Sequence, residues 1–177
     1  MSYLLRAFFF FFLQKNNGKV LKEFHADPIT KCIKTSKNTL SVWISSTSDF
    51  TSNEVKDLIL AFASSTQQPA TLDFIWLKEE LLVSEKIEII ETDGVTKFEE
   101  KKDKHRDLAN LTYEKLGIVS QHIMNQFQDS QNSYRITVSK LLNLMVEAVT
   151  GDNPKIKFDE LSESWQRNLQ KVIDRSG

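Results

Sequence analysis

The sequence predicts an α+β fold, in which a mostly antiparallel sheet of about five strands precedes three C-terminal α-helices. In the first half, apolar and polar residues alternate with the period of a strand, and after about residue 98 apolar residues recur at helical spacing. A chain of 177 residues, 40% hydrophobic and 27% charged, is typical of one soluble domain with its own core. The expected order of the first elements is βββαββ.

The N-terminal segment predicts a β-hairpin. Residues 4–13 and 19–24 are its expected strands, and Gly18 belongs to the polar turn between them. Five consecutive phenylalanines, Phe8–Phe12, would point to both faces of the first strand, which then needs cover on both sides. Arg6 interrupts this apolar run, which is also shorter than the ~20 residues that span a bilayer. Neither a membrane helix nor a signal peptide is therefore expected.

Three strands and one helix complete the predicted sheet region. Residues 38–45 alternate like a strand covered on one face, and residues 71–78 are apolar on both faces like a central strand. Residues 87–91 form a further strand. Between the first two of these strands, Thr51 and Glu54 form a capping box, which predicts the start of a helix.

Helical spacing continues to the C-terminus, with helices expected over about 109–127, 134–148 and 158–172. Residues 97–107 are mostly charged and are the expected junction between the sheet and these helices. A single domain over residues 1–177 is the preferred organisation, and a subdivision into residues 1–95 and 98–177 is the alternative.

Charge, cysteine and glycine content exclude several classes of protein. The formal net charge of -1 comes from 23 basic and 24 acidic residues, so no global field attracts nucleic acid or an anionic membrane. The single cysteine, Cys32, excludes an internal disulfide and favours a cytoplasmic location. The spacing of the five glycines matches neither a phosphate-binding loop nor a Rossmann motif. We expect no cofactor and no structural metal.

The histidines give little sign of catalysis. Cys32 and His25 form a thiol–imidazole couple close in sequence, yet a half-buried loop cysteine is the preferred interpretation. His105 lies in a charged run, where a solvated histidine is expected. His122 lies beside a helix seam, which is typical of a hydrogen-bonded boundary residue.

Carboxylates form the main candidate for catalysis. Asp73 interrupts an otherwise apolar strand, and Glu88 and Glu91 lie on the next predicted strand. If these strands are adjacent, Asp73 and one glutamate could hold a metal ion, as in a metal-dependent hydrolase or nuclease. The preferred alternative places Asp73 at a strand end or sheet margin, where it caps a turn.

Basic residues of the first third suggest a second alternative, which is nucleic-acid binding. Lys15, Lys19 and Lys22 could contact phosphates, and Trp43, expected on the polar face of its strand, could stack on a base. These lysines are scattered over predicted turns, so a solvated surface is the preferred interpretation.

The preferred function is a non-enzymatic, cytoplasmic protein–protein interaction module, such as an accessory, adaptor, antitoxin-like or immunity-like subunit. The expected partner is another protein or a second copy of the chain, nucleic acid is less favoured, and no membrane is expected. The expected partner-binding residues are large aromatic side chains of the type enriched in interface cores, namely Tyr113, Phe127, Tyr134 and Trp165. Packing of the same aromatic residues within the molecule is the alternative.

Overall fold

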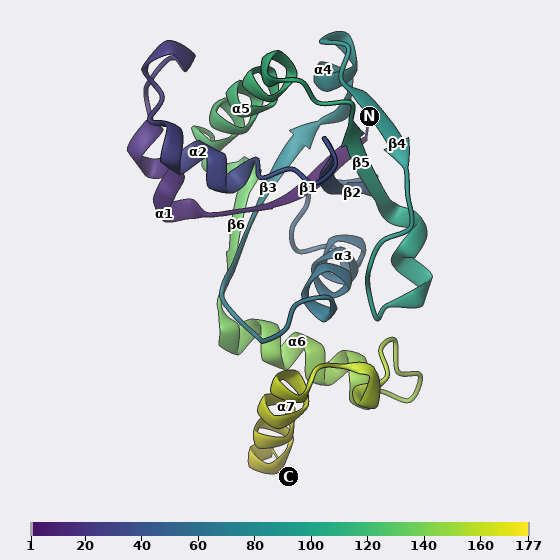
Figure 1. Ribbon diagram of the computed structural model, residues 1–177. Helices are drawn as coiled ribbons and strands as arrows, with labels where there is room; N and C mark the ends of the chain where they lie inside the picture. The colour runs from purple at the N-terminus through teal and green to yellow at the C-terminus, as the bar shows by residue number, and fades with distance from the viewer. Residues whose placement is uncertain (1, 177) are drawn as a thin grey trace.

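The computed structural model describes residues 2–176, without the side chains of Phe11, Phe12, Leu21 and Ser176. It contains a six-stranded antiparallel sheet with helices on both faces (Figure 1). The strands are β1 (Tyr3–Phe8), β2 (Leu40–Ser45), β3 (Leu72–Lys78), β4 (Glu88–Glu91), β5 (His105–Ala109) and β6 (Ser133–Ile136). The helices are α1 (Phe10–Leu13), α2 (Ala26–Cys32), α3 (Asn53–Ser64), α4 (Glu79–Ser84), α5 (Tyr113–Phe127), α6 (Val138–Thr150) and α7 (Glu163–Ser176).

The strand order across the sheet is β4-β5-β2-β1-β3-β6, which places β1 near the centre. β1 pairs with β2 on one side and with β3 on the other, and all neighbouring strands are antiparallel. β4 and β6 are the outer strands. Residues far apart in the sequence therefore meet over β5, β2 and β1, where the candidate site lies.

Alternation along the strands divides the apolar side chains between two cores. Leu5 and Trp43 belong to the core that also contains residues of α3, α6 and α7. Leu4 and Val42, their neighbours in the chain, belong to the opposite core with residues of α2 and α5. Figure 1 shows α3, α6 and α7 below the sheet, α5 above it, and α1 and α2 at its left in this view. Each strand of this central region thus loses water from both faces, which provides most of the driving force for folding.

The predicted α+β class is confirmed, and so are the strands expected at residues 38–45, 71–78 and 87–91. The helix expected after residue 51 is also present as α3. Its N-cap is Ser52 rather than Thr51, because the Ser52 hydroxyl accepts the amide hydrogen of Val55 at 3.3 Å.

The predicted N-terminal hairpin is wrong. The first strand ends at Phe8, α1 begins at Phe10, and the range 19–24 contains a 3₁₀ turn (Leu21–Glu23) instead of a strand. Both edges of β1 are already paired with β2 and β3, so no edge remains for a local hairpin partner. Of the phenylalanine run, Phe8 is buried and Phe9 is 53% exposed, while the side chains of Phe11 and Phe12 lie outside the described residues.

The second half contains two strands, β5 and β6, that were not predicted because the residues around them have helical spacing. The expected junction at residues 97–107 forms a 3₁₀ turn (Glu99–Lys104) and the start of β5, which pairs with β2. Tyr134 lies on β6 rather than on a helix, and only α6 and α7 follow the last strand of the described chain. The two short strands form because β2 and β3 offer open edges to them, a tertiary effect that local periodicity does not report. The division into one or two domains stays a prediction.

The remaining 3₁₀ turns lie at Gln14–Asn16, Ser130–Asn132 and Phe158–Glu160. Within residues 2–176, no helix combines the length and the apolar character needed to cross a bilayer.

Candidate functional site

A polar cleft of about 520 Å³ is lined by residues of three adjacent strands, β1, β2 and β5, and by the end of α3. We call it the sheet cleft. Its walls and floor include Arg6 from β1, Ser41 and Trp43 from β2, Phe62 from α3, and His105 and Asp107 from β5. Its volume lies in the range of small-molecule binding sites, about 300–1,000 Å³.

Arg6 enters the cleft where the ladder between β1 and β2 ends. The last paired residues are Leu5 and Trp43, and the Arg6 guanidinium lies beyond them. Arg6 Nη1 donates to the carbonyl oxygen of Ser41 at 2.8 Å, and Nη2 donates to that of Cys32 at 3.1 Å. The side chain thus takes over hydrogen bonding where the two strands separate.

The Arg6 cation has no carboxylate partner within the described chain. No ion pair within 4.0 Å involves its guanidinium, and the buried Arg6 Nε has no hydrogen-bond partner among the described residues. Burial lowers the pKa of Arg6 to about 10, and the charges of Cys32 and Asp107 oppose this shift. At neutral pH the side chain is therefore still a cation, held in a poorly solvated position.

Asp107 holds the other side of the cleft through hydroxyl groups. Ser41 Oγ donates to Asp107 Oδ1 at 3.2 Å, and Thr92 Oγ1 donates to Asp107 Oδ2 at 3.3 Å. Thr92 Oγ1 also lies 2.7 Å from Nδ1 of His105. Thr92 thus links His105 and Asp107 in a chain of three polar groups.

Burial lowers the pKa of His105, while the charge of Asp107 and a hydrogen bond to the Thr92 backbone oppose this shift. His105 is only 9% exposed, so the prediction of a solvated histidine is wrong. The ring also packs against Trp43, with centroids 5.1 Å apart and an interplanar angle of 78°. A neutral His105 leaves Asp107 as the negative group of this wall.

Trp43 forms part of the apolar floor and requires a glycine opposite it. A Cβ atom on Gly94 would lie 2.5 Å from Trp43 Cη2, closer than side chains pack. The loop after β4 can thus lie against the indole ring only because Gly94 has no side chain. Its neighbours Asp93 and Val95 then line the cleft.

A tight turn supplies a second cation at the cleft. Ser36 and Thr39 exchange backbone hydrogen bonds of 3.2 and 2.9 Å across the two residues between them. Those residues, Lys37 and Asn38, have φ angles of 52° and 61°, as in the two-residue turns that match the twist of a sheet. Lys37 lines the cleft and leads the chain into β2.

The predicted acidic site does not assemble. Asp73 lies on β3, while Glu88 and Glu91 lie on β4, and β5, β2 and β1 separate these two strands. Asp73 instead accepts hydrogen bonds from Arg135 Nε at 2.7 Å and Nη2 at 3.0 Å. Within the described residues, no three His, Cys, Asp or Glu side chains gather closely enough to hold a metal ion.

Glu88 and Glu91 have separate surface partners. Glu88 Oε2 accepts a hydrogen bond from Asn110 Nδ2 at 2.6 Å. Glu91 pairs with Arg106 at 2.9 Å. Both contacts link the outer strand β4 to the region of β5, so these carboxylates have a structural role there.

The four predicted partner-binding aromatics divide into exposed and buried residues. Tyr113 is 95% exposed at the first position of α5. Phe127 is 8% exposed, and Tyr134 stacks on Phe50 with centroids 5.0 Å apart. Trp165 is fully buried and donates its indole N–H to the carbonyl oxygen of Thr66 at 3.1 Å, so its prediction as an interface anchor is wrong. Only Tyr113 is available to a partner in the way that was expected.

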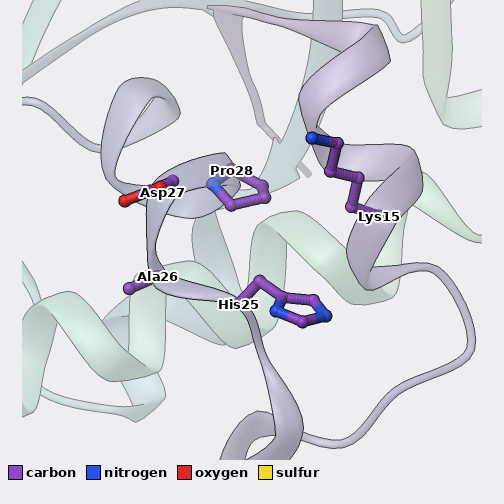
Figure 2. Close-up of a pocket in the computed structure, with 5 residues that line it drawn as sticks. All are labelled: Lys15, His25, Ala26, Asp27 and Pro28. Atoms are coloured by element: carbon purple, nitrogen blue, oxygen red, sulfur yellow. The ribbon is translucent and has the colours of Figure 1, made fainter.

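Trp43 cannot stack on a base as the nucleic-acid hypothesis requires, because it is 5% exposed and part of the core. Lys15, Lys19 and Lys22 lie in the irregular segment between α1 and α2. Lys15 borders an open hollow of about 650 Å³ beside α2, together with His25, Ala26, Asp27 and Pro28. Figure 2 shows Lys15 and His25 on different sides of this hollow, with the carboxylate of Asp27 directed away from both.

Cys32 lies at the end of α2 and is buried, rather than half-buried in a loop. Its sulfur accepts a hydrogen bond from the backbone amide of Phe9 at 3.5 Å. Burial raises the pKa of the Cys32 thiol, which makes it a weaker nucleophile at neutral pH. His122 is partly buried on α5, and the hydrogen bond expected of it stays a prediction.

Sequence reasoning missed the sheet cleft because its members come from segments with no shared motif. The sequence did contain one signal, which is the charged residue Arg6 within an apolar run. We interpreted this residue only as evidence against a membrane helix. Comparison with protein-family models, with curated proteins and with solved structures finds no match. The chemistry of the site therefore rests on its geometry.

Proposed function

We propose that this protein is a non-enzymatic binding protein whose sheet cleft recognises a carboxylate. The observation that carries the proposal is the guanidinium of Arg6, which borders the cleft without a carboxylate partner among the described residues. A cation removed from water costs several kcal/mol unless an opposite charge offsets it. A bound anion would supply that charge.

Arginine is suited to this role by its geometry. Its planar guanidinium presents five N–H donors, and two of them serve the carbonyl oxygens of Ser41 and Cys32. Donors remain for a ligand, and the fork matches the two oxygens of a carboxylate. Ala7 and Phe62, both partly exposed, add apolar surface against which the rest of such a ligand can pack.

Binding is a better conclusion than catalysis because the polar groups of the cleft lack a nucleophile–base pair. The Ser41 hydroxyl donates directly to Asp107, without an imidazole between them. His105 uses Nδ1 for Thr92, whose proton goes to Asp107. This chain fixes the wall of the cleft, and it activates no hydroxyl that lines it.

The test is a calorimetric titration with 3-phenylpropanoate, which combines a carboxylate with an apolar ring. We expect the wild type to bind it and Arg6→Gln to bind it at least about tenfold more weakly, the effect of one lost charge-assisted contact. Arg167→Gln, on the exposed surface of α7, is the matched control and should bind normally. Equal binding by wild type and Arg6→Gln would disprove the proposal.

A second candidate function is protein–protein interaction through the start of α5. The specific observation is Tyr113, a large aromatic side chain that is 95% exposed. Aromatic residues of this kind are frequent hot spots in interfaces. The test is affinity purification of the whole protein at mild salt, with wild type and Tyr113→Ser compared. A stoichiometric protein partner lost with Tyr113→Ser supports this candidate, and a partner retained by the variant contradicts it.

A further inference from the structure

The two walls of the sheet cleft carry opposite charges. Arg6 lies on β1 and Asp107 on β5, and β2 separates these strands. Neighbouring strands are about 4.8 Å apart, so the backbones of β1 and β5 lie about 10 Å apart where all three run together. Both side chains line the cleft, Arg6 where β1 and β2 separate and Asp107 from β5, so a ligand in the cleft meets a cation and a carboxylate.

Ser41 connects the two charges without joining them. Its carbonyl oxygen accepts from Arg6 Nη1 at 2.8 Å, and its hydroxyl donates to Asp107 Oδ1 at 3.2 Å. Arg6 and Asp107 form no ion pair within 4.0 Å, although each influences the other electrostatically. Both groups stay available to a ligand, because Asp107 has more lone pairs than its two hydroxyl donors use.

Resting on the proposed function, we infer that the preferred ligand is a small zwitterion of the α-amino-acid type with an apolar side chain. Its carboxylate would bind the guanidinium of Arg6, and its ammonium group would bind the carboxylate of Asp107. Its side chain would pack on Ala7 and Phe62. A ligand with both charges would pair with Arg6 and with Asp107, whereas a simple anion gains only the contact with Arg6.

The experiment compares three probes of the same ring size by calorimetry at neutral pH. L-phenylalanine carries both charges, 3-phenylpropanoate lacks the ammonium group, and 2-phenylethylamine lacks the carboxylate. We expect wild type to bind phenylalanine at least about tenfold more tightly than either singly charged probe, since each lost charge removes one charge-assisted contact.

Two variants assign the contacts. Arg6→Gln should weaken phenylalanine and 3-phenylpropanoate alike. Asp107→Asn, which keeps the shape of the side chain and one of its two acceptor oxygens, should weaken phenylalanine but leave 3-phenylpropanoate equal or tighter. Far-UV circular dichroism checks that each variant is folded, and the comparison of the three probes on wild type decides the question even if a variant does not fold.

The outcomes distinguish a failure of the zwitterion inference from a failure of the proposed carboxylate binding. If 3-phenylpropanoate binds through Arg6 as tightly as phenylalanine does, carboxylate recognition stands and the zwitterion inference is overturned. If neither carboxylate probe binds, or if only 2-phenylethylamine binds, the proposed function itself fails.

Discussion

Two arginines on the same sheet have opposite environments. Arg135 on β6 binds both carboxylate oxygens of Asp73, at 2.7 and 3.0 Å, and its guanidinium lies over the ring of Phe10 at 4.9 Å. Arg6 on β1 donates only to backbone carbonyl oxygens. The first arginine has a complete set of partners within the chain and serves the fold. Among the described residues, no carboxylate forms an ion pair with the second, which lines a cleft, as is expected of a binding group.

The largest expected effect is on the paired arginine. Asp73→Asn removes the charge that Arg135 binds, while keeping the size of the side chain. Because Asp73 is buried and Arg135 is about one third exposed, we expect the free energy of unfolding to fall by about 2–3 kcal/mol. Urea denaturation measures this change.

A double-mutant cycle with Arg135→Gln sharpens the result. If the ion pair carries the loss, the double variant should be less destabilised than the sum of the single variants. A change of less than about 0.5 kcal/mol for Asp73→Asn, within the range of ordinary surface substitutions, would show that the contrast between the two arginines is not energetic.

The next effect concerns the floor of the cleft beside Arg6. Gly94→Ala places a methyl group 2.5 Å from Trp43 Cη2, so we expect a loss of about 1–2 kcal/mol from overpacking. Gly117 is the matched control, because a Cβ atom there has no neighbour within 4 Å and the residue lies inside α5. Gly117→Ala should raise stability by about 0.5–1 kcal/mol. Thermal unfolding of Gly94→Ala and Gly117→Ala measures both changes in stability. If the two variants change stability by the same amount and in the same direction, the Gly94 loop can move away from the indole ring.

These two sites also show what the sequence could predict. The strands at β2, β3 and β4 and the helix α3 have strong local patterns, and each was predicted. β5 and β6 were missed because His105–Ala109 and Ser133–Ile136 are short and border helical patterns, and they become strands only by pairing with β2 and β3. Asp73 was correctly found unusual, but its partner Arg135 is 62 residues away and could not be inferred from spacing.

The cleft was harder to predict because it depends on strand order. Arg6, Ser41 and Asp107 meet only because β1, β2 and β5 are neighbours, and the sequence order of the strands does not imply this. The close contact of Gly94 with Trp43 is likewise a tertiary feature. Sequence reasoning had identified Trp43 as exposed, since its strand alternates, but the face called polar is covered by α3, α6 and α7.

A smaller effect should appear in the pH dependence of stability. Burial lowers the pKa of His105, so the folded protein binds this proton less readily than the unfolded chain does. Stability from this source is fully present above the unfolded pKa of about 6.5 and is lost as the pH falls below it towards the folded pKa. Burial also lowers the pKa of His122, with the same sign, although the charge of Glu85 opposes it.

Urea denaturation between pH 7.5 and 5 measures this slope. His105→Gln should reduce the slope of stability against pH, and adding His122→Gln should reduce the slope that remains. An unchanged slope in both variants would show that other groups cause the pH dependence, and the neutral state assigned to His105 beside Asp107 would then lose its support.

The smallest expected change in stability belongs to the unpaired arginine, and it completes the comparison. Arg6→Gln loses hydrogen bonds to Ser41 and Cys32, which costs about 1 kcal/mol, but it also removes a partly buried cation that forms no ion pair with the described residues. These terms have opposite signs, so we expect the free energy of unfolding to change by less than about 1 kcal/mol while carboxylate binding is lost. If Arg6→Gln instead loses as much stability as Asp73→Asn, Arg6 is a structural residue like Arg135. Its hydrogen bonds would then stabilise the fold, and the guanidinium would not be available to a ligand.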